Sequence, residues 1–373
     1  MKDVMGIIYT GENDARLREL TIIRAIAALP VAGRFRVIDF LVSSMVNGGM
    51  KNIGVIMQKN YHSLMDHLGS GKEWDLHGKN NGLHILPPFL TRENVGQYPG
   101  VLDALRSNTD YLNHSKQELV VLSNSTIIYN ADFKEMIAYH ESTGADVTLM
   151  YTKDPSMKRD EFGSYIVVDD SGVVTDIEVE PTHPSYENTF MQVILMKRDF
   201  LKDLVDKAVA HGLHDLSRDL LLRLIQEKQA KVNAYEYKGV CWNIDSVQSY
   251  FKFSMDILKP EIRKRLFVDE LPVYTKVRDE MPAFYSEQSK TVNSLVADGC
   301  VIEGIVENSI LFRGVKIAPN ARINNCIIMQ DGQVQEGAFI ENCILDKQTV
   351  IKRNSRLIGP EAYPIVIAKN VVI

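Results

Sequence analysis

The loop after the first apolar run of the sequence carries residues that decide whether a phosphate group can bind. Gly11 follows the β-branched run Val4 to Tyr9, and a glycine in such a loop lets backbone N–H groups approach a phosphate closely. Glu12 and Asp14 place two carboxylates on the same loop, where they repel phosphate. A purely structural role is the alternative, in which Asn13 or Asp14 caps the helix that follows.

Apolar runs alternate with helical patterns along most of the chain, and this alternation predicts an α/β fold with a mostly parallel sheet and helices on both faces. The runs are Val4 to Tyr9, Ile53 to Met57, Leu119 to Leu122, Val147 to Tyr151 and Tyr165 to Val168. Ligands of such sheets bind beyond the carboxyl ends of the strands. Thr10-Gly11 and Ser123-Asn124-Ser125-Thr126 lie at two of these ends and mark the predicted location of a site.

The C-terminal part of the sequence has a period that predicts a triangular parallel β-helix. Aliphatic residues lie six positions apart in the pairs Val296/Ile302, Ile317/Ile323, Val334/Ile340 and Ile351/Leu357. The fourth residue of each unit is of a type that tolerates positive φ, and the fifth is small. These residues are Gly299, Asn320, Gly337 and Asn354, followed by Cys300, Ala321, Ala338 and Ser355. A second register, Glu307-Asn308, Asn324-Asn325 and Glu341-Asn342, steps by 17 residues.

The four cysteines are widely spaced, without a C-x-x-C pair, which fits reduced thiols better than a disulfide framework or a zinc site. Cys326 and Cys343 fall one coil apart in the same predicted stack. Small core residues are the main interpretation of these two, and a redox pair is the alternative.

The composition of the 373-residue chain is that of an ordinary soluble protein, with 45% hydrophobic and 24% charged residues. Its formal net charge is −6 and no basic cluster would follow a phosphate backbone, so nucleic acid is not an expected partner. No run of 18 apolar residues occurs, and Met1-Lys2-Asp3 lacks the pattern of a signal peptide. We therefore expect a cytoplasmic protein without a membrane partner.

Several motifs resemble those of bacterial ADP-glucose pyrophosphorylase, also called glucose-1-phosphate adenylyltransferase. They are Gly33-Arg34-Phe35-Arg36-Val37-Ile38-Asp39-Phe40, Asp66-His67-Leu68-Gly69-Ser70-Gly71 and Trp74-Asp75-Leu76. The resemblance covers nearly the whole chain. It implies a Rossmann-like nucleotidyltransferase domain followed by a left-handed β-helix, and a role in forming ADP-glucose and diphosphate from ATP and glucose 1-phosphate for glycogen biosynthesis.

The catalytic positions that the resemblance implies carry other residue types here. Thr126 and Asn243 stand where the family has two metal-binding aspartates, and neutral side chains cannot hold Mg²⁺ against water. Glu12 and Asp14 stand where the family's phosphate loop has glycines. We therefore expect no catalytic residue, metal or other cofactor on this chain alone, with Mg²⁺ bound by a catalytic partner.

The substrate-binding lysines of the family are also replaced. Glu180, in Val179-Glu180-Pro181, stands at the sugar-phosphate lysine, and Ile26, in Arg24-Ala25-Ile26-Ala27-Ala28, stands at the other. A remnant of the nucleotide or sugar-phosphate pocket is expected at the matching residues Gly11, Arg16, Gly100 and Asp103.

Three arginines, Arg24, Arg34 and Arg36, lie close together in the N-terminal motif. In the family, basic residues of this region help to bind a phosphorylated regulator. Regulator binding is therefore one interpretation of the arginines, and structural ion pairing is the other.

Taken together, the replacements resemble those of the non-catalytic GlgD-type subunits of heteromeric ADP-glucose pyrophosphorylases. We expect a nucleotidyltransferase-like domain over 1–255, a linker over 256–290 and a β-helix over 291–373. The predicted function is that of a regulatory subunit, inactive or very weak alone, in a heterotetramer with a catalytic subunit and a phosphorylated effector.

Two other functions stay open. An active nucleotidyltransferase could use a rearranged metal site with neighbours such as Asp132 or Asp245. A stand-alone regulator could bind a sugar phosphate or nucleotide and act on another system. A hexapeptide acyltransferase is disfavoured because no exposed His lies within the repeats from Val296 to Leu357.

Overall fold

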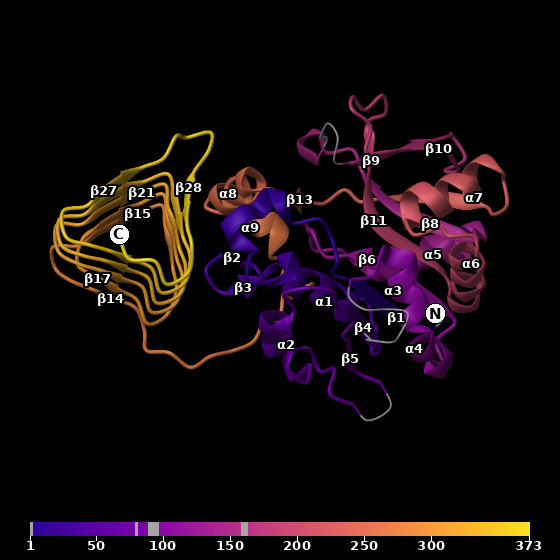
Figure 1. Ribbon diagram of the computed structural model, residues 1–373, viewed down its shortest axis with the longest axis horizontal. Coiled ribbons are helices and arrows are strands. Elements are labelled where there is room, and N and C mark those ends of the chain that lie inside the picture. Colours follow the sequence, from indigo (N-terminus) through magenta and orange to yellow (C-terminus); the bar gives the residue numbers. More distant parts are fainter. Residues whose placement is uncertain (1–2, 79–80, 89–96, 158–162) are drawn as a thin grey trace. The chain divides into compact units, whose positions relative to one another are not determined.

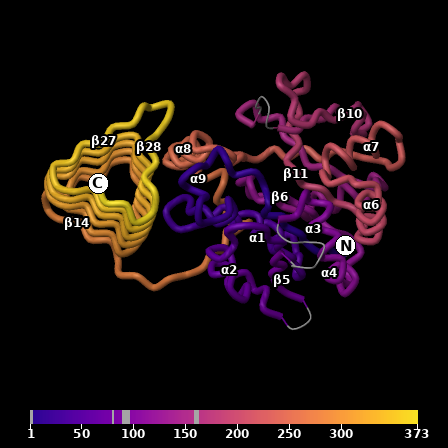
Figure 2. The backbone as a smooth tube through the Cα atoms, viewed as in Figure 1, coloured from indigo at the N-terminus to yellow at the C-terminus, as the bar shows by residue number. Residues whose placement is uncertain are grey.

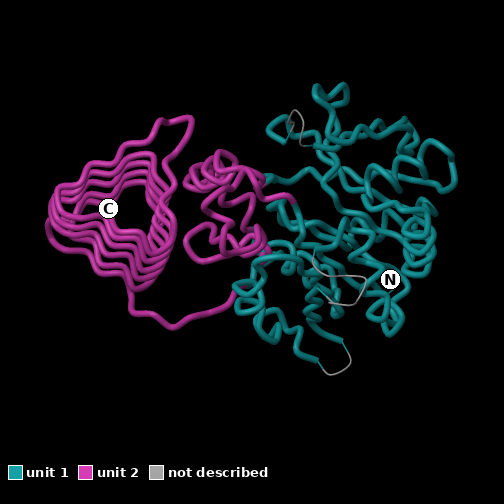
Figure 3. Tube along the Cα trace, in the orientation of Figure 1, with its two compact units in different colours: residues 1–12, 40–243, 268–274 teal, residues 13–39, 244–267, 275–373 magenta. Residues whose placement is uncertain are grey.

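The computed structural model describes residues 3–78, 81–88, 97–157 and 163–373 (Figure 1). The chain forms two compact units, which are coloured separately in Figure 3. Unit 1 consists of residues 1–12, 40–243 and 268–274, and unit 2 consists of residues 13–39, 244–267 and 275–373.

Unit 1 is built on a nine-stranded sheet whose central strands are parallel. These strands, in the order β6-β1-β4-β5, are Leu119–Asn124, Val4–Tyr9, Ile53–Ile56 and Leu83–Leu86. Strand β11, Asn188–Lys197, runs antiparallel to both β6 and β8. The remaining strands are β8 Val147–Thr152, β9 Ser164–Val168, β10 Val174–Val179 and β12 Val232–Glu236. The five predicted strands are thus confirmed.

Helices cover both faces of this sheet, as predicted. Successive residues of a strand point to opposite faces. Met5 and Ile7 of β1 join a buried cluster with residues of α3 and α6, whereas a Cβ at Gly6 would lie 2.5 Å from the Met45 sulfur of α1. The helices are α1 Val37–Asn47, α2 His62–Leu68, α3 Val101–Ser107, α4 Thr109–His114, α5 Phe133–Thr143, α6 Arg198–Ala210 and α7 Leu222–Gln226.

The C-terminal part of unit 2 is a left-handed parallel β-helix made of three five-stranded sheets (Figure 2). The first sheet holds β14 Phe284–Tyr285, β17 Val301–Ile302, β20 Lys316–Ile317, β23 Gln333–Val334 and β26 Val350–Ile351. The second holds β15 Lys290–Val292, β18 Ile305–Glu307, β21 Arg322–Asn324, β24 Phe339–Glu341 and β27 Arg356–Ile358. The third holds β16 Leu295–Val296, β19 Ile310–Leu311, β22 Ile327–Ile328, β25 Cys343–Leu345 and β28 Ile365–Ile367.

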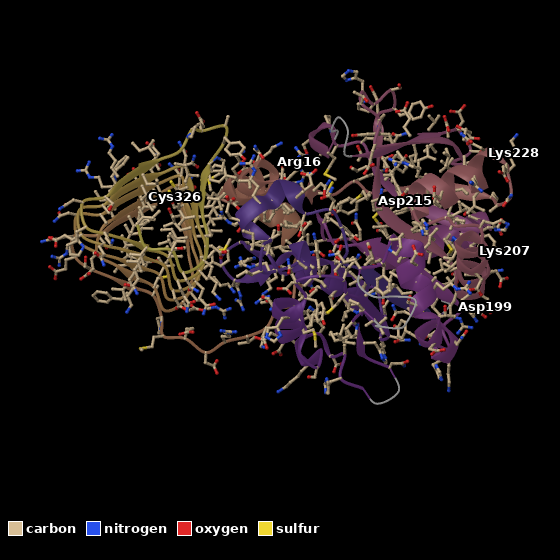
Figure 4. All side chains as sticks on the ribbon, viewed as in Figure 1. Arg16, Asp199, Lys207, Asp215, Lys228 and Cys326 are labelled. Atoms are coloured by element: carbon tan, nitrogen blue, oxygen red, sulfur yellow. The ribbon has the colours of Figure 1, made fainter. Side chains whose placement is uncertain are left out.

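The six-residue period matches the interior of this β-helix. The inner aliphatic residues Ile302, Ile317, Ile323, Val334, Ile340 and Ile351 are at most 1% exposed. The predicted turn residues have positive φ, with values of 74° at Gly299, 60° at Asn320, 69° at Gly337 and 57° at Asn354. Cys326, labelled in Figure 4, and Cys343 are both fully buried in this interior as free thiols. The sequence period therefore defines both the buried stacks and the corners.

The segment predicted as a linker over 256–290 contains regular structure, and the predicted start of the β-helix is wrong. The β-helix begins with β14 at Phe284, before the predicted start at residue 291. The aliphatic period does not show this first strand because Phe284 and Tyr285 are 57% and 47% exposed and stack on one side only. The segment also contains helix α9, Pro260–Leu266, which follows α8, Val247–Asp256.

Unit 2 also contains an N-terminal segment that the sequence assigned to the first domain. Its elements are η1 Ala15–Leu20, η2 Ile26–Ala28, β2 Pro30–Val31 and β3 Phe35–Arg36. The Tyr250 hydroxyl of α8 donates to the Pro30 carbonyl at 2.6 Å, and Arg24 pairs with Asp346 beyond β25. These contacts join residues far apart in the chain, which is why the domain boundary at residue 255 did not anticipate them.

Candidate functional site

The loop after β1 retains the close packing of a ligand-binding turn. A Cβ at Gly11 would lie 2.1 Å from Gln58 Oε1 and 2.3 Å from the Tyr9 hydroxyl, so a larger residue there would have to displace these side chains. The Tyr9 hydroxyl donates to Gln58 Oε1 at 2.7 Å, and Gln58 Nε2 donates to the Tyr98 carbonyl at 2.9 Å. The position of the loop beside β1 is therefore fixed by internal hydrogen bonds.

Glu12 crosses from this loop to the end of β6. Its carboxylate accepts hydrogen bonds from the Ser125 backbone N–H and from Ser125 Oγ, with oxygen–oxygen distances of 2.9 and 3.1 Å. Ser125 is only 2% exposed. The two predicted strand ends, β1 and β6, thus meet through a carboxylate of the chain itself.

The environment of these strand ends is acidic. Burial raises the pKa of the Tyr9 hydroxyl, and the carboxylates of Glu12, Asp103 and Asp215 raise it further. Each of these carboxylates opposes the approach of a polyphosphate. The electrostatics are therefore opposite to those of a phosphate-binding loop.

The two positions that the resemblance aligns with metal-binding aspartates lie at the neighbouring strands β7 and β13. Thr126 precedes β7, Ile127–Ile128, whose Ile127 is paired with Asn243 of β13, Trp242–Asn243. Thr126 is 7% exposed, and the buried Oδ1 of Asn243 has no hydrogen-bond partner in the described structure. A neutral hydroxyl and a neutral amide do not supply the anionic oxygens that Mg²⁺ requires, so these residues do not fit the ion.

The other residues of the predicted pocket remnant make contacts within unit 1. Gly100 precedes α3, and a Cβ there would lie 2.2 Å from the His214 carbonyl oxygen. Asp103 lies in the first turn of α3, 2.9 Å from His214 Nδ1. The neighbouring Asp215, labelled in Figure 4, caps the η5 segment Leu216–Leu221 by accepting from the Arg218 N–H. Asp103 and Gly100 thus both lie against His214.

A cation, Arg218, lies near Glu180, the position at which the family resemblance places a sugar-phosphate lysine. Arg218 Nη2 lies 2.7 Å from Glu180 Oε2, with both side chains more than half exposed. Glu180 and Gln192 have φ values of 50° and 56°, which are strained conformations for residues other than glycine. The Gln192 side chain joins Ser164 Oγ at 3.1 Å and Ser217 Oγ at 3.2 Å. Polar side chains of the chain itself therefore lie around Glu180, where the family resemblance places a lysine.

The remaining predicted residues belong to unit 2. Arg16 is exposed and lies 3.7 Å from Asp245, whereas Ile26 is buried in η2 at 2% exposure. Arg24 is 2% exposed and binds both carboxylate oxygens of Asp346, at 2.9 and 2.8 Å. Asp14 occupies the N-cap position of η1 without a side-chain cap hydrogen bond, and Asn13 Oδ1 accepts from the Ala15 N–H at 3.1 Å. The Arg24 guanidinium is thus held in a buried structural ion pair with Asp346.

A group of cations lies beside the Arg24–Asp346 pair. Burial lowers the pKa of Lys347 to about 8, and the charges of Arg36, Arg24 and Lys369 also lower it, whereas Asp346 opposes the shift. An amine whose neighbours are mostly cations favours an anionic ligand. The sequence pattern placed Arg36 in this region but missed Lys347, because Lys347 follows Arg36 by more than 300 positions in the chain.

Arg34 is not among the cations whose charges act on Lys347. It is exposed, and its guanidinium lies over the Phe35 ring at 5.6 Å from the ring centroid. Its charge also lowers the pKa of Arg313 on the β-helix, where burial is the larger cause. Arg34 therefore remains available for an anion.

The fold and these positions define a nucleotidyltransferase domain joined to a hexapeptide-repeat β-helix. Residues 5–260 match the nucleotidyl transferase family, and residues 281–362 match the family described as GlmU-like, C-terminal hexapeptide. The second match begins close to β14 and supports the corrected start of the β-helix.

Comparison with individual proteins defines the family more closely. The chain is 34% identical to "Glycogen biosynthesis protein GlgD" of Bacillus subtilis, over 99% of this chain and 96% of that protein. It is 30% identical to glucose-1-phosphate adenylyltransferases of Fervidobacterium nodosum and Thermotoga maritima, over 96% and 85% of this chain and 86% and 75% of those proteins. The chain belongs to the glucose-1-phosphate adenylyltransferase family of glycogen biosynthesis and is GlgD-like. Among the described residues, no helix is long and apolar enough to span a membrane.

Proposed function

We propose that the chain is a non-catalytic regulatory subunit that modulates a catalytic glucose-1-phosphate adenylyltransferase subunit in the cytoplasm. The observation that carries this proposal is the neutral pair Thr126 and Asn243 at the positions of the family's metal-binding carboxylates. Without Mg²⁺ to neutralise the reacting phosphates, the transition state loses several kcal/mol of stabilisation, and each ~1.4 kcal/mol slows the reaction tenfold.

A rearranged metal site is less well supported by the geometry. Asp132 caps helix α5 by accepting from the Lys134 N–H at 2.9 Å. Asp245 accepts from Ser249 Oγ at 3.1 Å at the start of α8 and faces Arg16. Both carboxylates thus have roles in capping or ion pairing. No group of three His, Cys, Asp or Glu side chains suited to a metal occurs in the described parts of the chain.

The proposed effector is a phosphorylated metabolite, bound in unit 2 by the cations around Lys347. Asp346 pairs with Arg24, and the charges of Arg36 and Lys369 act on the Lys347 amine beside this pair. This arrangement supports regulator binding by Arg36 and a structural role for Arg24. It also supports the regulatory proposal over a stand-alone sensor that binds nucleotide at the acidic strand ends of unit 1.

Reconstitution tests this function directly. The purified chain, supplied with ATP, glucose 1-phosphate and Mg²⁺, is expected to form ADP-glucose at a background rate. Added to a catalytic subunit of the family, it is expected to form a hetero-oligomer and to change the effector dependence of that subunit. Turnover by the chain alone within tenfold of an ordinary enzyme, roughly 10 per second, would contradict the proposal.

A further inference from the structure

Ser125 presents two hydrogen-bond donors at the carboxyl end of β6, and both are directed at one anionic group. The backbone N–H and the hydroxyl converge on the Glu12 carboxylate, with Ser125 Oγ 2.9 Å from Glu12 Oε1. Convergent N–H and O–H donors are the groups that bind an oxyanion. The carboxyl edge of parallel strands is also the place where α/β proteins hold ligands.

We propose that Ser125 forms a phosphoanion-binding position in unit 1 and that Glu12 occupies this position as an internal ligand. The inference rests on the proposed function, since membership of a nucleotide-using family suggests the class of ligand. Glu12 then excludes nucleotides and diphosphate by filling the position as well as by charge.

Occupation and repulsion are different mechanisms, and the contacts favour occupation. A carboxylate that acted only by repulsion would lie toward solvent, where its charge is hydrated. Glu12 is instead half-buried and binds a side chain that is 2% exposed. Charge-assisted hydrogen bonds of this kind are about twice as strong as neutral ones, so an external anion must displace a well-bound group.

The surroundings explain how Glu12 reaches Ser125. Gly11 packs against Tyr9 and Gln58, and this fixes the chain direction just before Glu12. The parallel pairing of Tyr9 with Asn124 places the two strand ends side by side. The side chain therefore spans neighbouring strand ends without any rearrangement of the sheet.

Binding of inorganic diphosphate and of ATP, each without Mg²⁺, tests the inference by calorimetry on the full-length chain. Glu12→Ala empties the position and is expected to bind diphosphate at least tenfold more tightly than the unmodified chain. Glu12→Gln removes the charge but still fills the position, so its gain is expected to be smaller than that of Glu12→Ala. If Glu12→Ala raises the affinities for ATP and for diphosphate by the same factor, the position recognises the phosphates alone. A larger increase for ATP shows that the nucleoside is recognised as well.

Two further variants test which residues are responsible for the increase in diphosphate affinity. Glu12→Ala combined with Ser125→Ala keeps the N–H but removes the hydroxyl, and it is expected to lose part of the affinity gained. Glu187→Gln makes the same charge change at an exposed residue and is expected to bind as weakly as the unmodified chain. If Glu12→Ala does not fold, as judged by circular dichroism, Glu12→Ser replaces it because its hydroxyl is too short to reach Ser125.

Three results would overturn the inference: no gain for Glu12→Ala, an equal gain for Glu12→Gln, or a gain that persists unchanged without the Ser125 hydroxyl. Stimulation of a catalytic subunit is measured separately with the same variants. If neither the unmodified chain nor any variant stimulates the catalytic subunit, the proposed function is refuted, while the result on anion binding still stands.

Discussion

At the scale of single residues, the proposed loss of catalysis rests on the charge of a few side chains. Thr126 and Asn243 are neutral, and Glu12 and Glu180 bring negative charge to the binding positions of unit 1. The loop before Glu12 packs closely, since Gly11 lies against the side chains of Tyr9 and Gln58. The charges rather than the fold therefore account for the expected loss of catalysis.

Restoring the carboxylates tests this account. Thr126→Asp with Asn243→Asp is expected to bind Mg²⁺ in the presence of nucleotide, because carboxylate oxygens suit this ion. Turnover is expected to stay at background, since Glu12 and Glu180 still oppose the phosphates. Calorimetric titration with Mg²⁺ gives the first result and an ADP-glucose assay gives the second.

The control for this variant adds two charges elsewhere in unit 1, as Thr143→Asp with Asn188→Asp, and is expected to bind no Mg²⁺. Measurable ADP-glucose formation is expected only when Glu12→Gly, Asp14→Gly and Glu180→Lys are added, because metal and phosphate contacts act as one unit. Absence of Mg²⁺ binding in the two-aspartate variant would contradict the assignment of these positions.

The pKa of Lys347 predicts a pH dependence of stability. It is lowered from 10.5 to about 8 by burial and by the charges of Arg36, Arg24 and Lys369. Between these pH values the unfolded state binds more protons than the folded state, so the free energy of unfolding rises with pH. Lys347→Met is expected to reduce this rise, as measured by denaturant titrations from pH 7.5 to 10.5.

A pH dependence that is identical with and without the Lys347 amine would show that the group titrates at its ordinary pKa. Lys238→Met, which makes the same change at an exposed position, provides the matched control.

At the scale of elements, the corners of the β-helix depend on asparagines with positive φ. Asn325 and Asn342 have φ values of 52° and 50°, and Asn325 Nδ2 donates to Asn342 Oδ1 on the next coil. Asn342 Nδ2 continues the ladder to the Gly359 carbonyl at 2.9 Å. Asparagine therefore supplies both the backbone conformation and a side-chain bond between coils.

Substitution of Asn325 separates these two contributions. Asn325→Ala is expected to lower the free energy of unfolding by about 2 kcal/mol, from backbone strain of about 1 kcal/mol and a lost hydrogen bond of about 1 kcal/mol. Asn325→Gly loses only the hydrogen bond and is expected to be the milder change. Thermal unfolding followed by circular dichroism compares the two, and equal destabilisation would exclude the strain contribution.

At the scale of the whole molecule, the β-helix provides open sheet edges on which another subunit could pack. Strands β27 and β28 are the last strands of their sheets, and Ile358 of β27 is 42% exposed. The C-terminal residues pair with β26 through Val372, which is 54% exposed. Unpaired strand edges favour association with another chain. We therefore expect the β-helix to carry the contacts with the catalytic subunit.

Deletion of residues 284–373 is expected to abolish assembly with a catalytic subunit, as measured by light scattering, while the sheet of unit 1 stays folded. The segment 13–39 is expected to become sensitive to protease, because Arg24 loses its buried partner Asp346. A hetero-oligomer formed by the truncated chain would show that the contacts lie elsewhere.

The sequence by itself determined the repeating and local features of this protein. The six-residue period defined the β-helix interior and its positive-φ corners, because each coil repeats the same steric requirements. Alternating apolar runs likewise defined the strands of unit 1 and the strand ends near Gly11 and Ser125.

Only the tertiary structure decided which distant side chains meet. Glu12 binds Ser125 across 113 positions and Arg24 binds Asp346 across 322, and neither pair has a local signal. The assignment of the segment 13–39 to the β-helix unit has the same origin. Periodicity reports the face on which a residue lies, whereas a contact between distant residues depends on how whole elements pack, and that information is spread over the complete chain.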